Sequence, residues 1–155
     1  MRFTTKTEYG LICLVQMANH YLHKKVVAVR DMVDEEKYSL PYIEKIFQKL
    51  RAAGIVRAHH GNQGGYALAR SPAEITLRQV VEALEGGTFD VFCDTATRET
   101  IVCTHLCLCG MKPVWKKTKQ ILDDYYESIT LDMIAKHRTI PVPMAQAARR
   151  EASWQ

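Results

Sequence analysis

Four of the chain's five cysteines lie between residues 93 and 109. They are Cys93, Cys103, Cys107 and Cys109, and His105 stands between the second and the third. Thiolates are soft ligands, and a group of them on one loop suits an iron–sulfur cluster, zinc or copper. Packing in a core is the alternative, but cysteines that are buried for their hydrophobicity need no such clustering. The segment is therefore predicted to be a metal or redox site.

Disulfides are not expected. The start of the chain, "MRFTTKTEYG", lacks the apolar run of a secretory signal, and no 18-residue apolar stretch occurs. These features predict a soluble, cytoplasmic protein that has no membrane partner. In that reducing compartment an odd number of cysteines fits metal, redox or packing roles better than a disulfide framework. Cys13 has apolar neighbours at helical spacing, so we expect it to pack in the core.

Basic charge is concentrated in one segment. The net charge is +4, and residues 39–70, here called the basic segment, account for all of it. The segment holds five basic residues and one acid: Lys45, Lys49, Arg51, Arg57, Arg70 and Glu44. Such an island on a neutral background is typical of a phosphate-binding surface. A solvated face with spare lysines is the alternative.

The elements that must position these groups follow from the sequence pattern. Thr5 and Glu8 form an apparent capping box, which predicts a first helix from Thr5 to His20. Residues 26–37 predict a short second helix. Ser39 is a suitable N-cap for a third, which Gly54 ends. The apolar face of that third helix contains Leu40, Ile43, Phe47 and Leu50, and its outward face contains Tyr42, Glu44, Lys45, Gln48 and Lys49.

A hairpin is expected directly after the third helix. Residues 55–60 and 66–70 read as strands around a glycine-rich turn, with Arg57, His59 and His60 near its tip. Two helices, a basic helix and then a basic hairpin are the order of a winged helix-turn-helix. The predicted fold class is mainly α with a small β-hairpin. The outward face of the third helix offers groups that can meet base edges and phosphates in a major groove.

The second half of the chain is predicted to hold a loop and a long helix. Thr76 and Gln79 form a capping box for a helix that ends at Gly86. Pro113 then opens a helix with a wide aromatic and aliphatic stripe, for which a partner subunit is the natural cover. Packing on the first helix is the alternative. The stripe contains Val114, Trp115, Thr118, Ile121, Leu122, Tyr125, Tyr126 and Ile129.

These patterns divide the chain into four parts. They are a winged helix-turn-helix DNA-binding domain over residues 1–87, a cysteine-rich loop over 88–110, a dimerisation helix region over 111–137 and a flexible tail over 138–155. No nucleotide-binding fingerprint and no convincing Ser/His/Asp set occurs in the sequence. An enzyme is therefore not expected.

Several motifs in order resemble one known family. They are "MRFTTKTEYGL", "SLPYIEKIFQKLRAAGIVRAHHGNQGGYALAR", "ITLRQVVEALEG", "CTHLCLCGMKPVW" and "ESITLDMI". Together they resemble the bacterial IscR, NsrR and RirA group of winged-helix regulators, the Rrf family, over residues 1–136. The resemblance implies a homodimeric transcription factor that binds double-stranded DNA. Many proteins of this group hold an iron–sulfur cluster through three cysteines before the long helix, and the fourth ligand varies.

Carried onto this chain, the resemblance implies that Cys93, Cys103 and Cys109 ligate the cluster. Cys107 is favoured as the fourth ligand because its thiolate is soft. The alternatives are His105 and Glu8. A [2Fe–2S] cluster is favoured, with [4Fe–4S] as the alternative.

For DNA, the resemblance implies base reading by Tyr42, Glu44 and Lys45 and phosphate contacts from Ser39 and Arg2. Lys49 joins them as a basic residue of the same helix. The family's hairpin tip usually has Arg-Gly where this chain has His60-Gly61, so the minor-groove contact is expected to be weaker.

The predicted function is a repressor that senses cluster, iron, redox or nitric oxide status. A zinc- or thiol-based DNA-binding regulator is one alternative, and a cluster carrier or redox protein is another.

Overall fold

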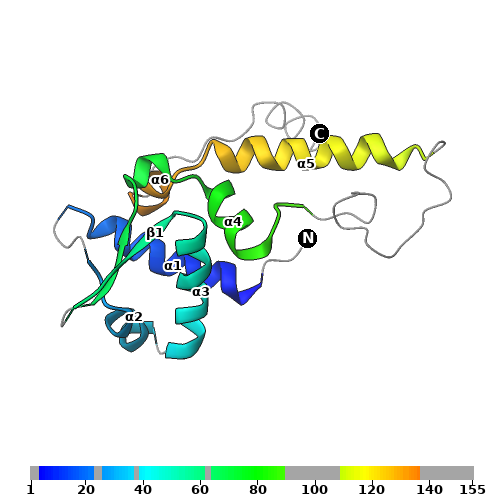
Figure 1. Cartoon of the computed structure of the whole chain (residues 1–155). Coiled ribbons are helices and arrows are strands. Elements are labelled where there is room, and N and C mark those ends of the chain that lie inside the picture. The colour runs from blue at the N-terminus through cyan, green and yellow to red at the C-terminus, as the bar shows by residue number, and fades with distance from the viewer. Residues whose placement is uncertain (1–3, 23–25, 37–38, 62–63, 90–108, 137–155) are drawn as a thin grey trace, which may run out of the picture.

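The computed structural model describes residues 4–22, 26–36, 39–61, 64–89 and 109–136. Its helices are α1 (Thr5–Asn19), α2 (Val29–Glu36), α3 (Leu40–Ala52), α4 (Leu77–Glu85), α5 (Met111–Glu127) and α6 (Leu131–Ala135), with a short 3-10 helix at Pro72–Glu74. Two strands, β1 (Val56–His59) and β2 (Gly65–Leu68), form an antiparallel hairpin. The predicted mainly α fold with a small hairpin is confirmed. Figure 1 shows α1 to α4, α6 and the hairpin gathered in one body, from which α5 extends.

The core lies between α1, α3, α4, the hairpin and α6. Its fully buried side chains include Leu14, Phe47, Leu50, Leu84 and Leu131, one or more from each of the four helices. Of the four residues predicted for the apolar face of α3, Ile43, Phe47 and Leu50 are inaccessible to solvent, whereas Leu40 is only half-buried. This core fixes which side of α3 faces outward.

The hairpin is joined to the segment that precedes α2. Val27 and Tyr66 exchange two main-chain hydrogen bonds, with N···O distances of 2.8 and 2.9 Å. Gly65 permits this approach, because a Cβ atom at that position would collide with the main chain of Val27. The prediction of one helix over residues 26–37 is therefore wrong at its start. Val27 forms a β-bridge, and α2 begins at Val29.

Local signals place the ends of α3 and α4 correctly. Gly54 follows the last turn of α3 with φ of 69°. The backbone N–H of Gln79 donates to Thr76 Oγ1 and the N–H of Thr76 donates to Gln79 Oε1, both at 3.3 Å. Gly86 ends α4 in the left-handed conformation, with φ of 92°. The capping box and the glycine stop predicted for α4 are thus confirmed.

The expected capping box at the start of α1 is wrong. The N-cap is Thr4, and no side chain caps the helix. The Thr4 hydroxyl instead donates to Glu85 Oε1 at 2.5 Å, 81 residues away in the chain. The Thr4 hydroxyl, which could cap the helix locally, is therefore bound to the distant carboxylate of Glu85. Glu8 is exposed on α1.

The boundaries of the long helix also differ from those expected. α5 begins at Met111, so Pro113 lies within its first turn rather than opening it. Ile129 is not on the exposed stripe. It is only 3% exposed, and its carbonyl accepts a hydrogen bond from the N–H of Leu77 at 2.8 Å. Ile129 thus lies beyond the end of α5 and is buried in the chain's own core.

Within the described part of the chain, every helix is too short or too polar to serve as a transmembrane segment.

Candidate nucleic-acid interface

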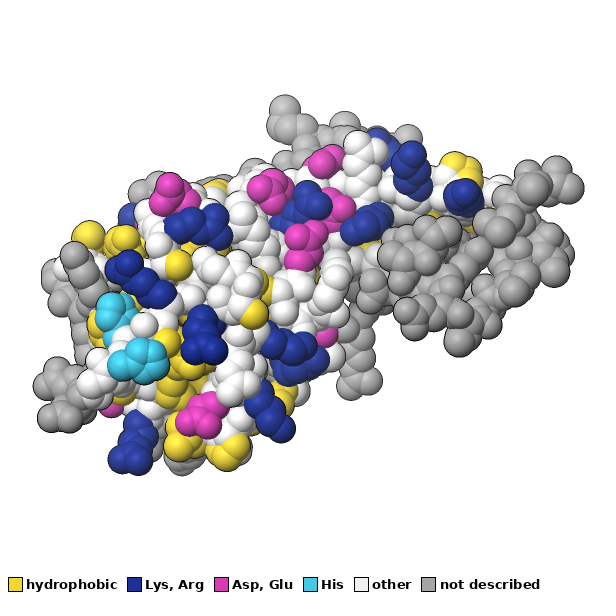
Figure 2. All heavy atoms as spheres, in the orientation of Figure 1, with side chains coloured by type: hydrophobic (Ala, Val, Ile, Leu, Met, Phe, Trp, Pro, Cys, Tyr) yellow, Lys and Arg dark blue, Asp and Glu magenta, His cyan; other side chains and the backbone are white. Residues whose placement is uncertain are grey.

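The third helix presents a polar, mostly basic face to solvent. Its core-facing side chains leave Glu44, Lys45, Gln48, Lys49 and Arg51 on the outside. In Figure 2 the part of the visible face that carries α3 and the hairpin shows histidine, lysine and arginine side chains. Acidic and basic side chains are mixed where α5 lies. Lys45, Lys49 and Arg51 of the basic segment are thus exposed on α3.

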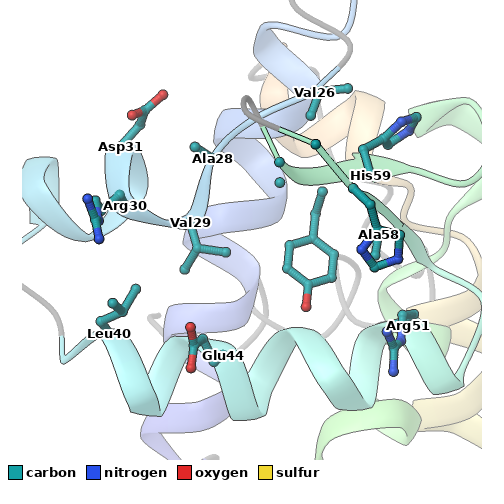
Figure 3. Close-up of a pocket in the computed structure, with 15 residues that line it drawn as sticks. Val26, Ala28, Val29, Arg30, Asp31, Leu40, Glu44, Arg51, Ala58 and His59 are labelled. Atoms are coloured by element: carbon teal, nitrogen blue, oxygen red, sulfur yellow. The ribbon is translucent and has the colours of Figure 1, made fainter.

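A groove of about 870 Å³ is lined by residues of α2, α3 and the hairpin. Its cationic or protonatable lining residues are Arg30, Arg51, His59 and His60, and its acids are Asp31 and Glu44. Figure 3 shows Val29 and Arg30 of α2 opposite Leu40 and Glu44 of α3, with His59 and Arg51 toward the hairpin end. An open hollow between a basic helix and a hairpin suits a polyanionic ridge such as a nucleic-acid backbone.

The predicted contact residues differ in how available their polar groups are. Ser39 is the exposed N-cap residue of α3, and its side chain makes no capping hydrogen bond. Glu44 and Lys45 are exposed on the outward face. His60 and Gly61 are exposed at the hairpin tip, where Gly61 has φ of 129°. These five groups are accessible to a partner.

Two other predicted contact residues are held by the protein itself. The hydroxyl of Tyr42 shares a 2.9 Å hydrogen bond with that of Thr5, and its ring meets the edge of Tyr9 with centroids 5.9 Å apart. Lys49 Nζ donates to the carbonyl oxygen of Leu84 at 3.2 Å. Both side chains tie α3 to neighbouring helices. Arg2, the remaining predicted DNA contact, lies outside the described residues.

Sequence reasoning missed Arg30 as part of this surface. Its position near the start of α2 brings it to the groove wall opposite α3. No local pattern marks such a residue, because its place depends on the angle between two helices. Arg51 and His59 were noticed as basic residues, but the groove that they line was not expected.

Of the candidate metal ligands, only Cys109 and Glu8 fall within the described residues. Cys109 is a half-buried free thiol two residues before α5. Its carbonyl accepts a hydrogen bond from the N–H of Lys112. Cys93, Cys103, His105 and Cys107 lie outside the described residues. No group of three metal-binding side chains occurs among the residues that the structure does describe.

Cys13 lies in the core, where it was predicted. Its side chain is inaccessible to solvent on α1.

The long helix has two unlike faces. Its inner face packs on the segment after α4: the ring of Trp115 lies 6.1 Å from that of Phe89, and Tyr126 is 7% exposed. The other face leaves Met111, Val114 and Ile121 at 46%, 47% and 51% exposure. These three recur at intervals of three and seven residues, so they form one stripe. Val114 and Ile121 of the predicted stripe are thus exposed, whereas Trp115 and Tyr126 lie on the inner face and Ile129 is buried. Met111 was not part of the predicted stripe.

A partly buried carboxylate joins α5 to α4 and to the residues that follow α4. Asp123 accepts hydrogen bonds from the Thr88 hydroxyl and from Lys119 Nζ, and Arg78 lies 3.8 Å away. Burial alone would raise the pKa of Asp123, but the Thr88 and Lys119 hydrogen bonds and the two cations outweigh it. The net pKa is below the usual value for aspartate. The carboxylate therefore stays ionised and fixes the inner face of α5.

Comparisons with known proteins cover most of the chain. The family model described as "Rrf2: Iron-dependent Transcriptional regulator" matches residues 3–137. The protein rrf2 of Nitratidesulfovibrio vulgaris is 30% identical over 131 residues, which are 84% of this chain and 85% of that protein.

Solved structures share the fold. T. potens IscR is 28% identical, with a TM-score of 0.64, and the match covers 92% of this chain and 93% of that one. CymR, the global cysteine regulator of B. subtilis, matches with a TM-score of 0.67 and 24% identity over 90% of this chain and 99% of its own. At that identity the likeness to CymR shows the fold alone.

Proposed function

The chain belongs to the Rrf2 family of transcriptional regulators, and from that premise we propose that it is a homodimeric repressor that binds operator DNA and responds to a cysteine-ligated iron–sulfur cluster. It is a helix-turn-helix transcriptional regulator and not an enzyme. As a bacterial regulator it would act in the cytoplasm. The observation that carries the proposal is the basic outward face of α3 beside the groove and hairpin.

In this proposal α3 enters the major groove. Glu44 would accept a hydrogen bond from a cytosine amino group, and Lys45 would meet a base or a phosphate. Ser39 and Arg2 would contact phosphates. The exposed positions of Ser39, Glu44 and Lys45 support these roles.

The hairpin would approach the neighbouring minor groove with His60 and Gly61. The DNA backbone between the two grooves would then occupy the hollow between α3 and the hairpin. Arg30 and Arg51 on its walls support that placement, because they supply cations on both sides.

The second copy of the chain would cover α5. Met111, Val114 and Ile121 are each about half exposed, and a stripe of that kind on an extended helix favours association. The inner face is already occupied by Phe89 and the core. The outer stripe is therefore the surface available for a partner, and a twofold dimer would present two α3 helices to two operator half-sites.

The cysteine ligands would be Cys93, Cys103 and Cys109, with Cys107 in the fourth position and His105 or Glu8 as alternatives. The donor set fits an iron–sulfur cluster, because three soft thiolates match its preference. Cys109 supports this as a half-buried free thiol at the start of α5. A bound cluster would supply a redox- and iron-sensitive charge beside the helix proposed for dimerisation. A [2Fe–2S] cluster is favoured over [4Fe–4S].

The test begins with anaerobic purification, an absorption spectrum and assays of iron and sulfide. Coloured protein that contains both elements and selects a duplex from a random-sequence DNA library supports the proposal. A colourless protein with one zinc per chain and retained DNA binding would instead indicate the zinc-based regulator. A coloured protein without salt-dependent DNA binding would indicate a cluster carrier.

A further inference from the structure

Three helices meet closely at Gly10. A Cβ atom there would lie 2.6 Å from Leu84 Cδ1 of α4 and 3.3 Å from Ile46 Cγ2 of α3. Only a glycine allows α1, α3 and α4 to approach so closely without displacing these side chains. The three helices are neighbours in Figure 1 as well. The orientation of α3 is therefore set partly by the helices on which it packs at this junction.

Hydrogen bonds also connect each pair of these three helices. Tyr42 of α3 bonds to Thr5 of α1, and Lys49 of α3 donates to the Leu84 carbonyl of α4. The third link, between α4 and the start of α1, is made by Glu85. Helix α3 is thus tied near both of its ends, once to α1 and once to α4.

Glu85 makes its link through a single oxygen atom. Oε1 accepts from the Thr4 N–H at 3.1 Å, from the Thr4 hydroxyl at 2.5 Å and from the Thr7 hydroxyl at 2.5 Å. Partial burial works to raise the pKa of Glu85, but these hydrogen bonds outweigh it and the net pKa is lowered. Thr7 is 1% exposed, so its hydroxyl has no solvent to replace this acceptor.

We propose that Glu85 is a positioning residue for DNA recognition. Its hydrogen bonds to Thr4 and Thr7, here called the lock, join the start of α1 to the end of α4 and thereby keep α3 in its binding orientation. This inference rests on the proposed function, since it requires α3 to read DNA. Base contacts need side chains held within a fraction of an ångström. Loss of the lock would let α1, and with it the Thr5–Tyr42 contact, shift relative to α3. Glu85 itself need not touch DNA.

The test compares variants that keep or remove the acceptor oxygen. The probe is a duplex that the wild-type protein selects from a random-sequence library, and a scrambled duplex measures non-specific binding. Glu85→Met keeps the side-chain length without an acceptor, whereas Glu85→Gln keeps an oxygen at the same place. Glu82→Met is the matched control, because Glu82 lies on α4 and pairs with Arg78 of its own helix. All binding is measured where circular dichroism shows the variants folded.

We expect Glu85→Met to weaken binding to the selected duplex about tenfold and to leave binding to the scrambled duplex unchanged. Glu85→Gln and Glu82→Met should bind both duplexes as the wild type does. Thr7→Val should weaken selective binding in the same direction, and the double variant should be no weaker than Glu85→Met, because both changes break one link.

Other outcomes overturn the inference. A Glu85→Met protein that melts earlier but keeps its selectivity would show that the lock serves stability only. Additive losses in the double variant, or an equal loss in Glu82→Met, would also contradict it. If the wild type selects no duplex, the proposed function fails and the inference fails with it. If the wild type selects one and Glu85→Met binds it equally well, only the inference fails.

Discussion

The ammonium group of Lys49 donates a hydrogen bond to the carbonyl oxygen of Leu84 at the end of the neighbouring helix, 3.2 Å away. Lys45, one turn earlier on the same helix, is exposed to solvent. The two lysines look equivalent in the sequence, and sequence reasoning assigned both to DNA. In the structure one of them holds a helix end, where a cation also complements the helix dipole. Their substitution should therefore have different effects.

Replacing Lys45 with glutamine should weaken DNA binding and reduce the slope of log affinity against log salt by about 1, because one phosphate contact is lost. Lys49→Gln should lower the thermal midpoint, since the Leu84 carbonyl loses its partner. Fluorescence anisotropy over a salt series and thermal unfolding measure the two effects. Unchanged affinity and slope in Lys45→Gln would remove this residue from the interface.

Glu44→Ala should change which bases are tolerated more than it changes total affinity. A carboxylate that accepts from a cytosine amino group contributes about 1–3 kcal/mol of discrimination at that position. Truncation also removes a negative charge from the groove, so non-specific affinity should rise slightly. Selection from a random-sequence library by wild type and variant provides the comparison. Identical selected sequences would argue that Glu44 reads no base.

Ile121→Glu should shift the protein from dimer to monomer. The side chain is 51% exposed in the single chain, so a charge there is tolerated until a partner subunit covers it. Gln120→Glu is the matched control, because it adds the same charge at an exposed residue of α5 outside the apolar stripe. Sedimentation at micromolar concentration distinguishes the two states. If wild type and Ile121→Glu sediment alike, α5 is not the dimer surface.

Acid should destabilise the fold through Glu85 and Asp123. Hydrogen bonds lower the folded-state pKa of both carboxyls despite partial burial. Their contribution is therefore complete above the unfolded values of about 4 and is lost as pH falls through the folded values. Thermal midpoints measured from pH 6 to pH 3 should fall, and Asp123→Asn should flatten the change. A variant whose midpoint falls as steeply as that of the wild type would contradict this role of Asp123.

Features marked by adjacent residues were predicted well from the sequence. The span of α3, the hairpin and both ends of α4 follow from caps, apolar spacing and glycines that act within a few residues. The buried face of α3 followed from the same spacing. The outward residues of the candidate site were found for that reason.

Features that depend on a distant partner were not predicted. The Thr4 hydroxyl binds Glu85 rather than capping α1, and Ile129 is buried by pairing with Leu77. Lys49 is engaged by Leu84, and Arg30 reaches the groove through the angle between α2 and α3. Each of these requires knowledge of which elements meet, and one sequence does not contain that information in its local pattern.

The proposed iron–sulfur cluster depends on its cysteine ligands. Cys93→Ala, Cys103→Ala and Cys109→Ala should each lose the visible chromophore of anaerobically prepared protein, because a cluster without one thiolate ligand is poorly retained. Cys13→Ala should keep the chromophore, because the Cys13 side chain on α1 is buried in the hydrophobic core. Absorption spectra with iron and sulfide assays measure the outcome. Equal cluster content in wild type and in the first three variants would end the cluster proposal for this segment.

The fourth ligand is decided by a second set of variants: Cys107→Ala, His105→Ala and Glu8→Ala. Replacing the true ligand should shift the spectrum or speed cluster loss, whereas replacing a bystander should do neither. We expect Cys107 to be the ligand, because a thiolate is softer than an imidazole or a carboxylate. Glu8 is still an alternative ligand, because it is exposed on α1 and takes no part in the expected cap. A shift in Glu8→Ala alone would assign the fourth position to the N-terminal helix and would link the cluster directly to the helix that Glu85 holds.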